Sequence, residues 1–479
     1  MSTLALCNHA PCRMSSKQEN FSLLSKFFSA FPAQLKYYLI LATLLVLASL
    51  LVAPAKVYSQ TTGAPVVATG TLEVLTADGL QGQVSMSYLL HTDNDGPVYE
   101  LLFTTSPPPA DLVNGQRVTV TGTAEGNRLS VETLKLLTPD AKLPVTGTTA
   151  DNTLSVETLA LPAADANLAV NGDRRAVFIL IDLLNVKAST RYTRDQVATA
   201  MYALNMNGVP APAGTRSVRG LYQAASLGQV NFVPDSNNDG VPDVFGPFTI
   251  NYSYTGTCDY LYWTQAAEAA VQQAGIDLSR YQHRVFVLPR YSDIPACSWT
   301  GLANVGGDLS FCRTGIAYAE SPMVFAHELG HNLGMGHGGT DPENDGTINN
   351  AYGDYSDTMG NSQSWHLFNA AHVDQMQWYG NYINGIVTIT ASGTYDISVL
   401  DATLPPNPLP NPRIIRLQRP NNQGYYYLSY RQPTGYDNTL TTLYTQGVNI
   451  HGYPGSGPST TAFIKSLTDG TTFSDSAAK

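Results

Sequence analysis

The most informative segment of this 479-residue chain is SPMVFAHELGHNLGMGH, residues 321–337. Serine is a preferred N-cap residue and proline fits a first helical turn, so the segment predicts a helix that begins at Ser321. His327 and His331 are four residues apart, which places both imidazoles on one face of that helix. Gly334 can adopt a positive φ, and we expect it to end the helix and turn the chain back.

The histidines of this segment have the number and spacing of zinc ligands. His327 and His331 can bind one tetrahedral ion, and the turn after the helix returns His337 to it. Three protein ligands leave a position open for water, which is typical of a catalytic site; four would close a structural one. Glu328 can reach that water without binding the metal. The alternative is a capped helix whose histidines only pack or form hydrogen bonds, but the complete spacing favours zinc.

This site predicts hydrolysis of peptide bonds. Zinc lowers the pKa of its bound water, and Glu328 takes the proton as general base during attack on the scissile carbonyl. We therefore expect a zinc endopeptidase. The alternative is a cell-surface polymer-binding protein with an inactive peptidase domain, and the intact Glu328 argues against it.

A second mark follows the zinc segment. Residues 352–360 read YGDYSDTMG, and we expect Met359 to lie beneath the three imidazoles as a polarisable floor. The motif HExxHxxGxxH followed by this Met-turn resembles the metzincin clan of zinc peptidases. Some metzincins place a tyrosine two residues after the methionine, but Asn361 stands there, so a metal-linked tyrosine of that kind is not expected.

Within that clan, the chain most resembles the gametolysin family of secreted peptidases. Besides the zinc segment, the likeness rests on residues 217–228, 297–301, 352–354, 368–370 leading towards Trp378, and 426–431. The resemblance implies a protein or peptide substrate, such as a cell-wall or matrix glycoprotein, and an N-terminal propeptide or accessory domain. The N-terminal β region contains no cysteine, so latency through a thiolate on zinc, as in matrixins, is not available.

Four regions are predicted along the chain. Residues 1–55 are expected to be a signal peptide with a long leading region, because the apolar run 37–52 precedes small residues. Residues 56–171 alternate as short strands and predict an all-β propeptide or accessory domain. Residues 172–380 alternate buried strands with helices, which predicts an α/β metzincin-like catalytic domain with a mixed twisted sheet. Residues 381–479 predict a β-sandwich-like region, whose end we expect to be incomplete.

An internal repeat lies within the N-terminal region. Residues 120–134 recur with few changes as residues 145–159, and each copy has the pattern of two strands joined by a turn. Two copies are too few for a solenoid, so the repeat favours a small β-barrel or sandwich.

The composition suits a secreted protein. The formal charge is −11 and basic clusters are missing, so nucleic acid and anionic membrane surfaces are not expected partners. The apolar run 37–52 is shorter than the ~20 residues of a spanning helix. We therefore expect cleavage, no stable membrane span afterwards, and an extracellular location; a retained signal would leave the protein at the cell surface.

Residues 235–243 read DSNNDGVPD and resemble the first part of a calcium loop, with Gly240 at the turn. The calcium ligands would be Asp235, Asn237, Asp239 and Asp243. The glutamate that completes an EF-hand is missing, and the alternative is an Asx-rich turn between strands.

Three cysteines follow the expected signal peptide: Cys258, Cys297 and Cys312. They allow one disulfide and one thiol. Proximity in the sequence favours a bond between Cys297 and Cys312, although spacing alone does not determine the pairing.

Overall fold

The structure is a computed structural model that describes part of the chain. The described residues are 64–79, 83–94, 96–104, 107–109, 112–137, 170–190, 192–290, 292–313, 321–360, 365–420 and 423–475. They belong to one compact unit, which begins at Gly63. The expected signal region 1–55 and the second repeat copy at 145–159 lie outside the described residues. Among the described helices, none combines the length and apolar character that a membrane crossing requires.

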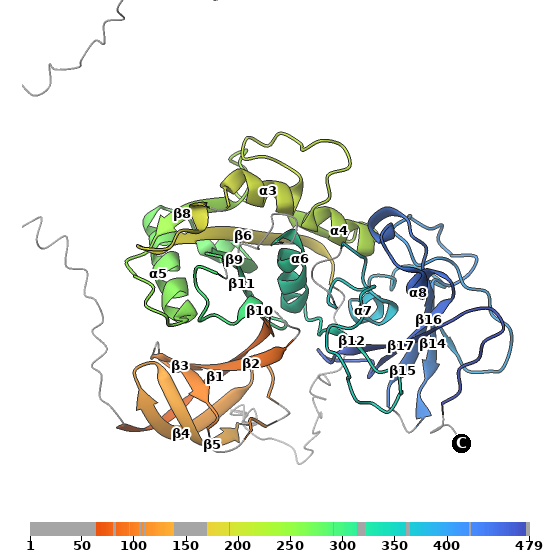
Figure 1. The fold of residues 1–479 in the computed structure, drawn as a ribbon, viewed down its shortest axis with the longest axis horizontal. Helices are drawn as coiled ribbons and strands as arrows, with labels where there is room; N and C mark the ends of the chain where they lie inside the picture. Colours follow the sequence, from red (N-terminus) through yellow and green to blue (C-terminus); the bar gives the residue numbers. More distant parts are fainter. Residues whose placement is uncertain are drawn as a thin grey trace, which may run out of the picture. The chain divides into compact units, whose positions relative to one another are not determined.

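Five strands at the N-terminal end close into a barrel (Figure 1). They are β1 (Ala64–Gly79), β2 (Val84–Thr92), β3 (Val98–Leu102), β4 (Arg117–Glu125) and β5 (Arg128–Leu136). β1 pairs with both β2 and β4, and β5 pairs with both β3 and β4, so the ring is complete. Alternate apolar side chains, such as Leu72, Leu90 and Leu129, fill its interior. The first repeat copy contributes the β4–β5 hairpin.

A mixed sheet with helices on both faces follows the barrel. Its strands are β6 (Gly172–Asp182), β7 (Val230–Val233), β8 (Val244–Thr249), β9 (His283–Leu288), β10 (Trp299–Asn304) and β11 (Leu309–Arg313). The continuous apolar run of β6 is buried on both faces, as its sequence predicts. Phe178 packs towards α3 (Arg194–Tyr202), α4 (Val218–Ala225) and α6 (Ser321–Asn332). Ile179 packs towards α5 (Tyr260–Gln273) on the other side.

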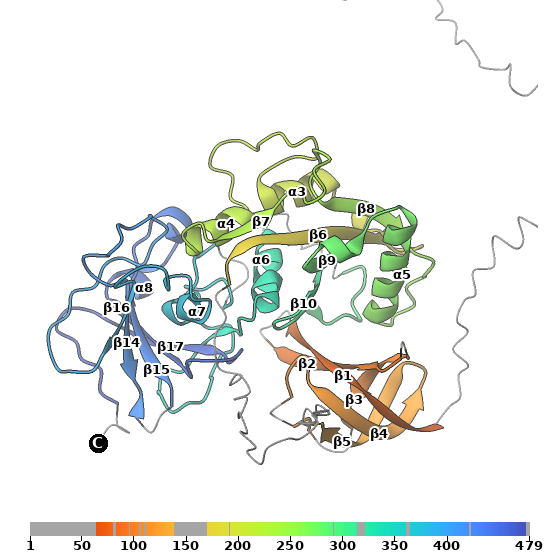
Figure 2. The same cartoon turned by 180° about the vertical axis from the view of Figure 1, so that it is seen from behind.

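The barrel and the mixed sheet are joined by one strand pair. The end of β1 pairs antiparallel with β10, and β10 pairs on its other side with β11. The strands therefore form one continuous eleven-stranded sheet among the described residues. Helix α6 contacts β10 and β11. Figures 1 and 2 show α6 above β10 from opposite sides.

The C-terminal strands form a single mixed sheet, which differs from the expected β-sandwich. Its order is β12 (Gly338–Thr340), β17 (Thr461–Leu467), β16 (Val448–Tyr453), β15 (Tyr425–Tyr430), β14 (Ile414–Gln418) and β13 (Ile386–Ile389). One face packs against α7 (Ala370–Gln375), so a helix occupies the place of a second sheet. Tyr427 and Tyr453 share one apolar cluster with Tyr222 of α4, so the core continues across the predicted boundary at residue 380. Shorter elements are α8 (Thr442–Thr445) and the 3-10 turns Ala188–Thr190, Leu278–Arg280 and Gly435–Asp437.

The disulfide differs from the predicted one. The sulfurs of Cys258 and Cys297 are bonded, with their Cα atoms 5.0 Å apart, and the expected Cys297–Cys312 bond is not formed. Cys312 lies in β11, where the register places Gly301 rather than Cys297 opposite it. The strand pairing separates Cys297 from Cys312, although they are close in sequence. The segment before α5 places Cys258 beside Cys297 instead.

Candidate metal centre

Helix α6 and the turn behind it position the three histidines. Gly334 has a φ of +103°, as its place in the sequence predicts. The amide of Gly334 donates to the carbonyl of His331 at 2.8 Å, and the amide of Met335 donates to that of Gly330 at 3.0 Å. These bonds satisfy the last carbonyls of the helix and reverse the chain, so that His337 returns to the helical histidines.

Three histidines and one aspartate meet at a buried point. The ligand atoms of His327, His331, His337 and Asp78 all lie within 4.8 Å of one another. Asp78 Oδ2 lies 3.3 Å from His327 Nε2 and 3.8 Å from His331 Nε2, while Asp78 Oδ1 lies 2.9 Å from His337 Nε2. None of the four residues is more than 5% exposed. Among the described residues, no second cluster of this kind is found.

The four side chains fit a zinc ion. Ligand atoms at zinc's usual bond length of ~2.0–2.1 Å lie about 3.3 Å apart in a tetrahedron, close to the separations observed here. Nε2 of His327, Nε2 of His331 and Oδ2 of Asp78 are buried without a hydrogen-bond partner. Leaving three such atoms buried without a hydrogen bond would be costly, and a shared cation would satisfy all of them.

Neighbouring carbonyls orient two of the rings. Nδ1 of His327 lies 3.0 Å from the carbonyl oxygen of Thr358, and Nδ1 of His331 lies 2.9 Å from that of Met335. A proton on each Nδ1 leaves Nε2 free to bind a metal. Burial lowers the pKa of His327 to about 3 and also lowers the pKa of His337, so these rings are neutral, as metal ligands must be.

Glu328 lies beside this cluster in a space that a glycine provides. Its side chain is 1% exposed, and its Oε2 has no hydrogen-bond partner. Burial, followed by the nearby Asp78 carboxylate, raises the pKa of Glu328 well above its ordinary value. Gly301 of β10 lies against this carboxyl group, and a Cβ at that position would overlap it. A strand residue with any side chain would therefore displace Glu328.

Met359 packs against α6 between the two helical histidines. It is fully buried, and a Cβ on Gly330 would overlap its sulfur. The Asp357 carboxylate holds the turn: Oδ1 accepts from the amide of Met359 at 2.6 Å, and Oδ2 accepts from the amide of Asn369 at 2.6 Å. The preceding carbonyl, that of Thr358, is the one that orients His327.

A buried aspartate connects the Met-turn to the C-terminal sheet. Oδ2 of Asp354 lies 2.9 Å from Nε2 of His451 in β16, and Oδ1 accepts from the hydroxyl of Ser356 at 2.6 Å. Burial opposes the charged form of Asp354, but His451 and the hydrogen bonds outweigh it and lower the pKa to about 2. The turn beneath the metal centre is thus fixed from the C-terminal sheet.

Two residues of the site escape prediction from sequence. Asp78 precedes Gly79, and an Asp-Gly pair normally predicts a turn. Tyr352 stands in the quoted segment before Met359, but no spacing rule connects it to the metal. Its hydroxyl lies 2.6 Å from Asp78 Oδ1, and its ring centroid lies 4.4 Å from that of His337. Burial, then Asp78, raises the pKa of Tyr352, so the hydroxyl keeps its proton.

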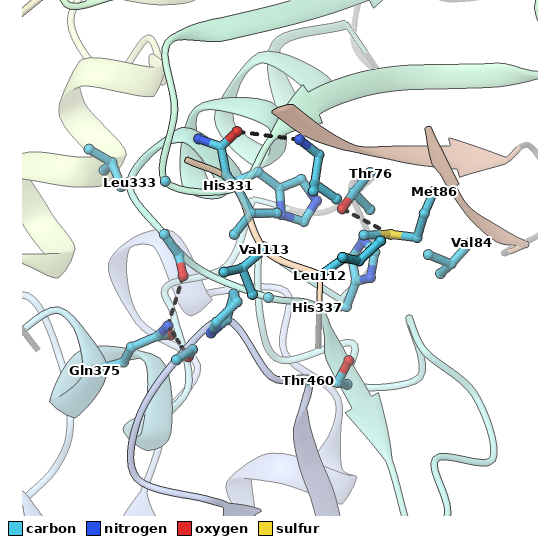
Figure 3. Close-up of a pocket in the computed structure, with 18 of the residues that line it drawn as sticks. Thr76, Val84, Met86, Leu112, Val113, His331, Leu333, His337, Gln375 and Thr460 are labelled. Carbon is cyan, nitrogen blue, oxygen red and sulfur yellow. Dashed lines mark hydrogen bonds between the residues drawn. The ribbon is translucent and has the colours of Figure 1, made fainter. Parts of the chain in front are cut away.

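A cavity of about 780 Å³ reaches the centre from one side (Figure 3). His331 and His337 line it together with Thr76 of β1 and Met86 of β2. Gln375 closes the far side, where its amide donates to the carbonyls of Gly334 and Gly457. The barrel therefore forms part of the wall beside the metal centre.

The proposed calcium loop has the hydrogen bonds of a turn. Oδ1 of Asp235 accepts from the amide of Asp239 at 3.1 Å, and its Oδ2 accepts from that of Gly240 at 2.8 Å. Asp243 accepts from the hydroxyl of Tyr281 and from the amide of Ser236. These carboxylates accept hydrogen bonds from backbone and side-chain donors, as in an Asx-rich turn. Calcium binding by Asp235, Asn237, Asp239 and Asp243 therefore receives no support.

A mixed α/β fold, a helix that carries two histidines and a glutamate, and a third histidine behind a glycine turn define the class of a metallopeptidase. The family model described as gametolysin peptidase M11 matches residues 175–468, which is more than half of the chain. The chain belongs to the gametolysin peptidase M11 family. A search among curated proteins found no match.

Proposed function

We propose that this protein is a secreted zinc endopeptidase of the metzincin type. His327, His331 and His337 hold the zinc ion, and Glu328 is the general base. The observation that carries the proposal is the convergence of three buried imidazoles beside a buried carboxyl group in a chain of a peptidase family. Zinc, when bound, polarises a carbonyl and makes water a better nucleophile at neutral pH.

The protein's own groups handle the proton. Glu328 accepts a proton from the attacking water and passes it to the leaving amine. Its raised pKa suits this exchange, because a base that also acts as an acid works best when its pKa is near the working pH. Gly301 keeps the carboxyl group in place, since the absence of a side chain there leaves room for it.

Tyr352 supplies a further donor. Its hydroxyl points at Oδ1 of Asp78, beside the histidine cluster, and would point at a substrate oxygen placed there. A neutral hydroxyl at this distance stabilises negative charge that develops on that oxygen. This tyrosine comes before the methionine of the turn, so it differs from the residue that follows the methionine in some metzincins.

The substrate fits as an extended peptide. Among the described residues, β10 pairs with β1 on one side and with β11 on the other. Without β1, β10 would be an edge strand, and main-chain pairing along an edge is a common way to bind a peptide. This supports a protein substrate. Cell-wall and matrix glycoproteins are the proposed class of substrate. The Cys258–Cys297 disulfide supports an extracellular location, because such bonds persist in oxidising compartments.

Turnover of casein by Glu328→Gln tests the proposal. Wild type and variant are loaded with zinc and given the same activating treatment with a second protease, which is then inhibited. We expect equal zinc content and a rate that falls by about 100-fold to 10,000-fold in the variant, because the amide cannot accept the proton.

The matched control is Glu125→Gln, which changes an exposed glutamate of the barrel. It should leave the rate unchanged. Equal rates in wild type and Glu328→Gln would exclude Glu328 as the base. Zinc binding without cleavage by any sample would favour the alternative of a polymer-binding protein with an inactive peptidase domain.

A further inference from the structure

The strand β1 belongs to the barrel over most of its length and to the peptidase sheet at its end. Residues Leu75 to Asp78 pair with β2 of the barrel and, at the same time, with Asn304 to Gly301 of β10. Without β1, this side of β10 would be an open edge. The main-chain groups that an extended substrate would use are therefore already occupied.

The side chain at the end of this strand reaches the metal centre. Asp78 lies opposite Gly301, and its carboxylate enters the cluster of three histidines with both oxygens. Oδ2 faces His327 and His331 at 3.3 and 3.8 Å, and Oδ1 faces His337 at 2.9 Å. The Tyr352 hydroxyl donates to Oδ1. The Asp78 carboxylate therefore occupies both this hydrogen-bond donor and the side of the histidine cluster where a fourth ligand would bind.

A catalytic zinc site needs an open position for water and substrate, and a fourth protein ligand closes it. The geometry points to β1 as an intramolecular inhibitor: Asp78 is the fourth metal ligand of the full chain, and β1 fills the peptide-binding edge of β10. This inference rests on the proposed function. The barrel contains no cysteine, so no thiolate can bind the zinc and keep the enzyme inactive; Asp78 would take that role.

Other contacts hold the strand in this position. Leu75, Ala77 and Leu89 of the barrel share an apolar cluster with Leu302 of β10 and the residues around α5. The hydroxyl of Thr300 donates to the carbonyl of Asp78 at 3.0 Å. These contacts remain when Asp78 alone is changed. The fourth coordination position of the metal can therefore be freed while the barrel stays in place.

The test uses the uncleaved full chain with Co²⁺ in place of zinc, because the visible spectrum of Co²⁺ reports its ligands. Wild type, Asp78→Asn, Asp78→Ala and the control Asp93→Asn are titrated with acetohydroxamate, a small metal-binding probe. Asp93 lies on the same barrel, 42% exposed and paired with Arg117. We expect the probe to change the spectra of both Asp78 variants but not those of wild type and Asp93→Asn.

Two further measurements use zinc-loaded samples in which the chain is uncleaved. The Asp78 variants should lose zinc to a chelator about tenfold faster, since one ligand is missing. Casein cleavage by the uncut variants should stay low, because β1 still fills the edge of β10. Asp78→Asn has nearly the shape of the native side chain, so it keeps the test valid if Asp78→Ala unfolds.

The outcomes separate this inference from the proposed function. Probe binding and chelator rates equal to wild type in both folded Asp78 variants would overturn the inference, even if cleavage after processing shows a peptidase. Probe binding only in the Asp78 variants would support Asp78 as the closing ligand, even if no sample cleaves casein and the peptidase proposal fails.

Discussion

The hydroxyl of Tyr352 donates to Oδ1 of Asp78 at 2.6 Å, across 274 residues of sequence. One partner belongs to the strand that enters from the barrel, and the other belongs to the segment before the Met-turn. The bond marks the position where an oxygen atom is held beside the three histidines. An oxygen of the substrate would occupy this position once Asp78 leaves it.

Tyr352→Phe should therefore reduce catalysis and not metal binding. In protein given the activating treatment described above, we expect kcat to fall by about 100-fold, as when one donor to a developing negative charge is removed. Zinc content and KM should change little. Steady-state kinetics on a peptide substrate measures this, with Tyr355→Phe, a half-exposed tyrosine nearby, as the matched control. An unchanged kcat would show that the hydroxyl only anchors Asp78.

The third histidine should be needed for the metal. His337→Ala removes a ligand that the turn at Gly334 brings back to α6, and we expect most of the bound zinc to be lost. Metal analysis in the Asp78→Ala background measures this, because Asp78 would otherwise remain as a third ligand in the full chain. His91→Ala, in the barrel and bonded to Glu73, is the control and should retain one zinc per chain. Full occupancy in His337→Ala would contradict the assignment.

Gly301→Ala should separate zinc binding from proton transfer. The added methyl group overlaps the carboxyl group of Glu328 and displaces it, while the three histidines stay in place. After the activating treatment we expect normal zinc content and a loss of kcat/KM of at least about tenfold, because a misplaced base loses its geometry. Activity equal to the parent protein would mean that Glu328 does not need this space.

Stability at low pH should depend on Asp354. Its pKa is about 2 in the folded protein and about 4 when unfolded, so the unfolded state binds the proton more tightly. The resulting stabilisation is fully present above pH 5 and is lost as the pH falls from about 4 to 2. It is of the order of ~2 kcal/mol.

Urea unfolding at several pH values measures this contribution. Asp354→Asn should lower the unfolding free energy near pH 6 and should lose less stability than wild type between pH 5 and pH 2. The exposed Asp469→Asn is the control and should follow the wild-type curve. Parallel curves for wild type and Asp354→Asn would exclude Asp354 as a source of acid sensitivity.

Local rules predicted the parts of the site that lie close together in sequence. The helix, the two histidines on one of its faces and the positive φ of Gly334 all depend on residues within one or two turns. The buried strand β6 was also predictable, since an unbroken apolar run needs cover on both faces.

Long-range pairing explains what could not be predicted. Asp78 reaches the histidines only because β1 pairs with β10, and no local pattern encodes that register. The Cys258–Cys297 bond likewise depends on the fold between the two residues. The C-terminal strands were recognisable, but their sequence did not show that α7 would cover the sheet in place of a second sheet.

The shared strand β1 also has a consequence for the handling of the mature enzyme. Once β1 departs, β10 exposes a row of unpaired amide and carbonyl groups beside a reactive centre. Such an edge accepts any extended chain, including a neighbouring copy of the enzyme, so self-association and self-digestion compete with the intended substrate. The barrel would then protect this edge until it is removed, and the lifetime of the free peptidase would be limited by its own concentration.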